Sequence, residues 1–253
     1  MTSAKKTEKA DSFGALGNRV PLPPFRPVQN TTLQANIYAE LKDAVMKGRF
    51  APGQSITLRE LAKAFDVSTM PVRGAVHQLI ADGAFEFTSS RAVAVPRMSR
   101  DKLMDLQRVR MTIEGRAAEW AAANITAEEI NLLRKLSVEY DVLNALSDDH
   151  TRIYEHLAKT KDFRFTIYRS ARSPTMIGII ETLWLKIAPY FNLFRGDWTP
   201  IAEKSHHYRA IVIEALEARN AEVAKQAIEN EIYQVGKILG ALLEKKKDDR
   251  IQN

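Results

Sequence analysis

Polar and charged side chains interrupt apolar stripes in the second half of this 253-residue chain. Four stretches repeat apolar residues at helical spacing, for example Leu103, Leu106, Ile113 and Ala117, and each stretch carries polar groups near its middle. A buried charge is costly unless it is paired. We therefore expect these groups to converge on one another or on a ligand. They are Arg110, Thr160, Arg164, His206, Arg209 and Glu231.

A second chemically suggestive set lies in the first hundred residues. Thr69, Arg73 and His77 share one face of a predicted helix, opposite an apolar face that includes Val72 and Val76. An arginine in this position can pair with guanine through two hydrogen bonds, although a single arginine on a helix face is most often an ordinary surface residue. Candidate partners for the DNA backbone or the minor groove are Arg59, at the start of the preceding helix, and Ser89, Ser90 and Arg91, at a hairpin tip.

The elements around this second set follow a recognisable order. Periodicity and turn residues predict a helix from about 33 to 48, a short strand at 55–57 and a helix beginning at 58. A third helix with Ser68 as its N-cap follows, and then a hairpin with arms at 85–87 and 93–95. This is the order of a winged helix-turn-helix, in which the second helix of the motif enters the major groove of DNA.

The remainder of the chain shows helical spacing without a convincing strand. We expect six helices, at 99–124, 126–146, 148–171, 173–195, 198–218 and 220–245. The predicted fold is mainly α, with an N-terminal winged helix-turn-helix and a C-terminal antiparallel helical bundle. The expected domains are a disordered, Pro-rich tail at 1–30, a DNA-binding domain at 31–97, a helical domain at 98–245 and a disordered tail at 246–253.

Composition agrees with a DNA-binding protein and narrows the classes. The chain has 37 basic and 31 acidic residues, and residues 1–98 hold 13 of the basic and 8 of the acidic ones, so most of the excess lies at the N-terminal end. The absence of cysteine excludes disulfides and thiolate sites. Without a signal sequence or a membrane-spanning run, we expect a cytoplasmic protein that does not bind membranes. None of the common catalytic motifs occurs, so we expect no enzyme and no catalytic residues.

The DNA-binding half resembles the GntR family. The resemblance is carried by residues 57–62 (TLRELA), 67–73 (VSTMPVR), 79–85 (LIADGAF) and 91–95 (RAVAV). It places Arg59, Ser68, Thr69, Pro71, Arg73 and Arg91 at DNA-contacting positions. Two residues depart from the family pattern. Ala92 stands where the wing usually has glycine, which puts a close backbone approach to DNA in doubt, and Gly74 stands where glutamate is usual.

The second half is similar to the FCD ligand-binding domain of FadR-type regulators in that family, from residues 110–114, 163–174, 183–184 and 215–224. The resemblance puts Thr160, Arg164, Arg209 and Glu231 where many FCD domains bind a divalent metal through an Asp or Asn and three histidines. Because guanidinium does not ligate such a metal, we expect no metal and no cofactor. With Arg110 nearby, three arginines against one glutamate predict a cationic pocket for a small anionic metabolite.

Several alternatives stay open at this point. Arg164, Glu231 and Arg209 could form an internal salt-bridge cluster that binds no ligand. A shifted ligand set that includes His206 would make the protein a metal-binding regulator. An architectural DNA-binding protein without effector is a further alternative. The resemblance itself implies a transcriptional regulator that binds a palindromic operator as a homodimer. Because repression is usual in the family, it also implies a repressor.

Overall fold

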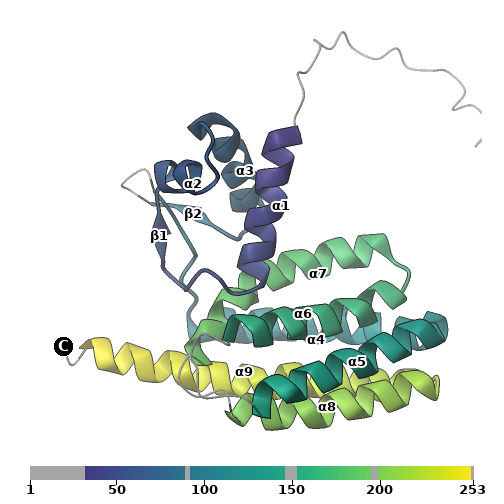
Figure 1. Ribbon diagram of the computed structural model, residues 1–253. Coiled ribbons are helices and arrows are strands. Elements are labelled where there is room, and N and C mark those ends of the chain that lie inside the picture. Colours follow the sequence, from purple (N-terminus) through teal and green to yellow (C-terminus); the bar gives the residue numbers. More distant parts are fainter. Residues whose placement is uncertain (1–31, 89–91, 146–152, 195–198, 252–253) are drawn as a thin grey trace, which may run out of the picture. The chain divides into compact units, whose positions relative to one another are not determined.

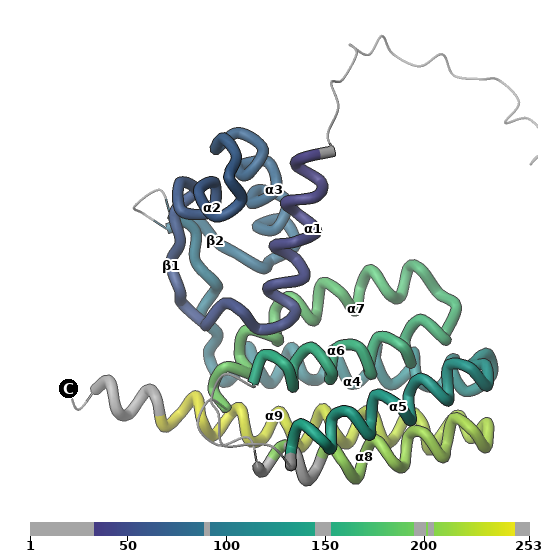
Figure 2. Tube along the Cα trace, viewed as in Figure 1, coloured from purple at the N-terminus to yellow at the C-terminus, as the bar shows by residue number. Residues whose placement is uncertain are grey.

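The computed structural model describes residues 32–88, 92–145, 153–194 and 199–251 (Figures 1 and 2). Helices dominate this part of the chain, and one small sheet accompanies them near the N-terminal end. This agrees with the predicted mainly α fold class. No helix among these residues combines the length and the apolar character that crossing a membrane would require. The predicted tail at 1–30 lies outside the described residues.

The N-terminal domain contains the expected helices and hairpin. Its elements are α1 (Thr32–Met46), β1 (Ser55–Ile56), α2 (Leu58–Ala64), α3 (Thr69–Ala81), β2 (Glu86–Phe87) and β3 (Val93–Ala94). The sheet has the order β1-β3-β2 and is antiparallel throughout, with Val93 opposite both Ile56 and Phe87. The sheet and the three helices share one core, in which Val45, Val72, Val76, Leu79 and Val93 are fully buried.

Local hydrogen bonds determine where α2 begins. Thr57 is its N-cap, and its hydroxyl accepts a hydrogen bond from the Glu60 backbone N–H at 3.1 Å. The Glu60 carboxylate accepts the Thr57 backbone N–H at 2.7 Å in return, which completes a capping box. Ser68 is the N-cap of α3, as expected, and has extended backbone angles, but its side chain makes no capping hydrogen bond. The start of α2 is therefore held more firmly than the start of α3.

The C-terminal domain is a bundle of long helices. They are α4 (Arg100–Asn124), α5 (Ala127–Ala145), α6 (Ile153–Ser170), α7 (Pro174–Ile187), the 3-10 helix η2 (Ala188–Phe194), α8 (Thr199–Glu217) and α9 (Ala221–Ile251). Helix α9 lies along α4 and α8, whereas α5 packs against α6 and α8 (Figure 1). The bundle closes around large aromatic side chains, of which Trp184, Tyr168 and Tyr190 are almost completely buried.

Two predicted boundaries are wrong. The helix expected at 173–195 ends at Ile187 and continues as a 3-10 helix, because Pro189 has no N–H and its ring clashes with the carbonyl four residues earlier. The last helix was expected to stop at 245 and to give way to a disordered tail. It instead runs to Ile251, since residues 246–251 contain neither glycine nor proline to end it.

The unequal caps of α2 and α3 give a testable prediction. Replacing Thr57 by alanine removes a hydrogen-bonded cap and should lower the free energy of unfolding by about 1 kcal/mol. Ser68→Ala removes a hydroxyl that makes no capping bond and should cost less than about 0.5 kcal/mol. Urea unfolding of both variants measures the difference, and equal losses would contradict the asymmetry.

Candidate functional site

The exposed face of α3 carries three of the side chains that were predicted to contact DNA. Thr69, Arg73 and His77 are exposed, whereas Val72, Val76 and Leu79 on the opposite face are fully buried. The predicted separation of the two faces is therefore confirmed. The His77 ring makes an edge-on contact with Phe87 of β2, with 5.2 Å between the ring centroids, which links this face to the wing. Pro71 is half-buried at the first turn.

Two further side chains frame this face. Arg59 is exposed one residue after the start of α2, where the capping box holds the backbone. Met70 on the first turn of α3 is 79% exposed, which is unusual for a large apolar side chain. Met70 was not among the residues predicted to contact DNA. An exposed apolar group at the start of a recognition helix can contact a thymine methyl group.

The two departures from the family pattern have physical explanations. The Gly74 backbone faces Gln34 of α1, whose side-chain oxygen would lie only 2.3 Å from a Cβ at position 74. A larger residue at position 74 would therefore require the end of the flexible Gln34 side chain to move. Ala92 is buried, and its carbonyl accepts the Thr88 backbone N–H at 2.9 Å, which closes the hairpin.

The backbone φ of Ala92 is not positive, so this position does not require glycine. The wing tip itself, with Ser89, Ser90 and Arg91, lies outside the described residues.

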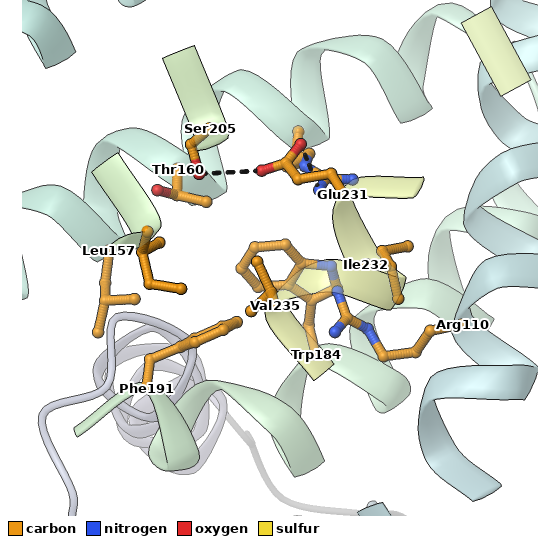
Figure 3. Close-up of a pocket in the computed structure, with 11 residues that line it drawn as sticks. Arg110, Leu157, Thr160, Trp184, Phe191, Ser205, Glu231, Ile232 and Val235 are labelled. Atoms are coloured by element: carbon orange, nitrogen blue, oxygen red, sulfur yellow. Dashed lines mark hydrogen bonds and ion pairs between the residues drawn. The ribbon is translucent and has the colours of Figure 1, made fainter. Parts of the chain in front are cut away.

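A small cavity lies inside the helical domain. It is lined by residues of α4, α6, α7, η2, α8 and α9, among them the predicted Arg110, Thr160, Arg164 and Glu231. Figure 3 shows Thr160, Ser205 and Glu231 along one edge and Trp184 with Arg110 at the opposite edge. Its volume is about 30 Å³, which leaves room for about one or two water molecules. A metabolite can enter only if side chains move.

The charges around this cavity form one buried network, which we call the ion network: Arg110, Glu114, Tyr168, Arg164, Glu231 and Ser205. Arg110 Nε donates to Glu114 Oε1 at 2.6 Å, and the Tyr168 hydroxyl donates to the other oxygen of Glu114. Arg164 donates to the Tyr168 hydroxyl at 2.9 Å and pairs with Glu231 at 2.8 Å. Ser205 donates to the second oxygen of Glu231 at 3.2 Å.

Burial and pairing set the protonation states in the ion network. Burial raises the pKa of Tyr168 well above its ordinary value, with a further contribution from Glu114, so the phenol stays neutral and donates. Burial alone would lower the pKa of Arg164, but Glu231, Tyr168 and Glu114 together outweigh this effect, and the pKa is raised. Arg164 therefore remains a cation and cannot act as a metal ligand.

Two predicted effector residues do not line the cavity. Arg209 and His206 both turn toward α5, where Arg209 donates to Asp141 at 2.8 Å and His206 Nδ1 lies 3.0 Å from the same carboxylate. Arg209 also stacks over Tyr140, 3.8 Å from the ring centroid. Arg209 is buried as the stripe predicted, but it is buried between α5 and α8, whereas His206 is exposed.

The predicted excess of positive charge is also wrong. Each of the three arginines has its own carboxylate: Glu114 for Arg110, Glu231 for Arg164 and Asp141 for Arg209. Of the suggested Arg164–Glu231–Arg209 cluster, the Arg164–Glu231 pair is present, whereas Arg209 pairs with Asp141. The spacing of Arg110 and Glu114, four residues apart on one helix, is a signal that could have revealed the first pair. Ser205 lies four residues before Arg209, so helical spacing could also have placed it on the same face of α8.

The acidic and histidine side chains do not gather into a metal site in the part of the chain that the structure describes. There, no group of three or more His, Cys, Asp or Glu residues lies close enough to hold an ion. Where the resemblance places a metal site, Arg164 and Glu231 instead hold each other.

Comparison with known proteins matches both halves of the chain. The family model of the bacterial regulatory proteins of the gntR family matches residues 33–95, and the FCD domain model matches residues 105–233. Among curated relatives, the HTH-type transcriptional regulator McbR of Escherichia coli K12 is 22% identical over 209 residues, which cover 82% of this chain and 92% of McbR. A protein of Paenarthrobacter nicotinovorans, named as a probable D-xylose utilization operon transcriptional repressor, is 23% identical and covers 80% of this chain and 86% of its own.

Solved structures share the fold. The Escherichia coli McbR/YncC structure aligns with a TM-score of 0.73 at 22% identity and covers 84% of this chain and 98% of its own. The structure of a GntR-type regulator from Rhodococcus sp. RHA1 aligns with a TM-score of 0.68 at 18% identity, covering 82% and 97% of the two chains. At these identities the likeness establishes the architecture of the chain and not its ligands.

The ion network predicts a large difference between buried and exposed ion pairs. Glu114→Gln leaves the Arg110 charge buried without its partner and should lower the free energy of unfolding by about 3–5 kcal/mol. Glu217→Gln breaks the exposed pair with Arg134 and should cost at most about 1 kcal/mol. Chemical denaturation compares the two variants, and a loss at Glu114 as small as that at Glu217 would show that the network contributes little.

Proposed function

This chain belongs to the GntR family of bacterial regulators, with an FCD domain as its C-terminal half, and we propose that it is a repressor that binds a palindromic operator as a homodimer. We further propose that a small anionic metabolite controls its affinity for this operator. Transcriptional regulation through operator DNA follows from the family. The homodimer, the repression and the metabolite are our proposal. A repressor role is supported by the name of the Paenarthrobacter relative, and twofold symmetry of a dimer suits a palindrome.

The exposed face of α3 supports the assignment of the DNA-reading residues. Arg73 stands in the middle of this face, with Thr69 one turn before it and His77 one turn after it. A guanidinium on such a face can donate two parallel hydrogen bonds to a guanine in the major groove. Ser68, Thr69 and Arg59 flank it where phosphates would pass, and these contacts position the protein without reading sequence.

The Arg164–Glu231 pair suggests how an anion would bind in the FCD domain. Both side chains line the cavity and both are buried. A carboxylate or phosphate suits the same guanidinium fork that Glu231 now occupies. We infer that the metabolite competes with Glu231 for Arg164. The displaced glutamate, whose other oxygen accepts from Ser205, then has to move, and α9 shifts relative to α6.

Helix α6 connects this cavity to the DNA-binding domain. Leu157, Thr160 and Arg164 of α6 line the cavity. The same helix reaches the end of α1: Lys161 forms an ion pair with Asp43, and Arg49 stacks over Tyr154 at 4.8 Å from the ring centroid. A shift of α6 on ligand binding would therefore pull on the helix that supports α3. Coupling of this kind typically changes affinity by about 1–3 kcal/mol.

The DNA-reading proposal is tested by Arg73→Ala. If Arg73 reads a guanine, its loss should reduce the preference for operator over unrelated DNA by about 1–3 kcal/mol. Arg59→Ala serves as the matched control, because loss of a phosphate contact should weaken binding to all sequences and lower the salt dependence by about one ion. Fluorescence anisotropy titrations at several salt concentrations measure both effects. An unchanged specificity ratio in Arg73→Ala would remove this residue from the recognition set.

The effector proposal is tested by thermal melting with phosphate, acetate, succinate, divalent metals and EDTA. We expect stabilisation by one of the anions and none by metals. Glu231→Gln removes the competing charge while keeping the shape, so the same anion should bind roughly ten-fold more tightly. The double variant Arg164→Met/Glu231→Met replaces the pair with apolar groups and should fold but lose the response.

Glu217→Gln is the control for a general charge effect, since that glutamate lies on the surface. Equal anion binding by Glu231→Gln and the unmodified protein would contradict the competition. A metal-dependent shift would instead favour a ligand set around His206 and Asp141.

A further inference from the structure

A second and larger cavity lies where the DNA-binding domain meets the helical domain. Its volume is about 450 Å³, within the range of about 300–1,000 Å³ that is usual for small-molecule sites. Its walls come from the wing sheet and the following linker on one side and from α4, α7 and η2 on the other. It shares no lining residue with the cavity of the ion network.

The interior of this junction cavity is mainly apolar. Leu106 and Val109 contribute from α4, Leu183 and Leu185 from α7, and Met98 from the linker. Val109 is 43% exposed, which leaves a large apolar side chain without full cover at the cavity wall. An apolar ligand body would bury this surface and gain free energy from doing so.

Basic side chains surround this apolar interior. Arg97, Lys102 and Lys186 line the cavity, and none of the three side chains forms an ion pair or hydrogen bond within the described residues. Two carboxylates, Glu86 and Asp105, lie on the same lining, and Asp105 is already bound to Arg108 at 2.9 Å. The positive groups therefore exceed the available negative ones, and two of them are flexible lysines.

The cavity also touches the elements that orient α3. The stem of Lys186 lies against the turn after α3, where a Cβ on Gly83 would be 2.8 Å from the lysine Cε. On the linker side, the Tyr190 hydroxyl donates to the Pro96 carbonyl at 2.7 Å. A ligand held by Lys186 and the linker would thus affect two of the contacts between the two domains.

We propose that this junction cavity is a second ligand site, independent of the ion network, and that it takes a compact amphipathic carboxylate with an apolar tail. The tail lies against Leu106, Val109 and Leu183, and the carboxylate pairs with Lys102 and Lys186. A purely polar anion would leave the apolar walls uncovered, and an uncharged apolar molecule would leave the lysines unpaired.

Octanoate is the probe, with octanol and octylamine as matched compounds that share its tail but carry no charge or the opposite charge. Isothermal titration calorimetry on the full chain should show saturable binding of octanoate, weaker binding of octanol and none of octylamine. Lys102→Gln/Lys186→Gln should weaken octanoate binding about ten-fold or more, because charge-assisted contacts are lost, and should leave octanol binding unchanged. Val109→Trp should fill the cavity and abolish the binding of both.

Two controls separate this site from others. Lys135→Gln/Lys237→Gln removes two exposed lysines on α5 and α9 that do not line the cavity, and it should bind octanoate like the unmodified protein. Glu231→Gln should also leave octanoate binding unchanged. Non-saturable binding, full binding by the Lys102/Lys186 double variant, or a change with Glu231→Gln would each overturn the proposal.

Discussion

The helical domain depends on one constraint, which is that each buried arginine must be matched by a carboxylate. Arg110 and Glu114 satisfy one another within α4, but Arg164 of α6 needs Glu231 of α9. Tyr168 joins the two pairs, because its hydroxyl accepts from Arg164 and donates to Glu114. The register between α4, α6 and α9 is therefore fixed by hydrogen-bond geometry as well as by apolar packing, since a shift of one residue would leave a charge unpaired in the interior.

This constraint also explains why the cavity beside the ion network is small and almost neutral. A buried ion pair adds little stability over apolar residues of similar size, so its value lies in selecting one arrangement and in being exchangeable. An ion pair that lines a cavity can be opened by a competing ion, whereas an apolar contact cannot. Under the proposed function, the Arg164–Glu231 pair would combine its structural role with a response to the metabolite.

The sequence predicted the DNA-binding domain better than the helical site. Helix α3, its buried and exposed faces and the hairpin followed from periodicity, because each of these depends on residues close together in the chain. For the bundle, the same periodicity showed correctly that Arg110, Arg164, Arg209 and Glu231 are buried. It could not show which neighbour each one faces, since that depends on helix packing, and so Arg209 and His206 were placed in the cavity wrongly. Two helix ends were also predicted wrongly. Pro189 lies inside a strongly apolar run, which favoured one continuous helix. The charged residues after 245 favoured a solvated tail, although the helix continues through them.

The contact between Gly48 and Asn192 has a consequence for exchanging domains between regulators of this kind. Gly48 has a φ of +66°, and a Cβ there would lie 2.5 Å from a methyl group of Leu157. The Asn192 amide donates to the Gly48 carbonyl at 2.6 Å and to the Phe50 carbonyl at 3.2 Å. A chimera cut in the linker near residue 97 would separate Gly48 from Asn192 and Leu157. Such a chimera would have to keep glycine at position 48, because any other residue there would be strained by the positive φ and would place a Cβ against Leu157.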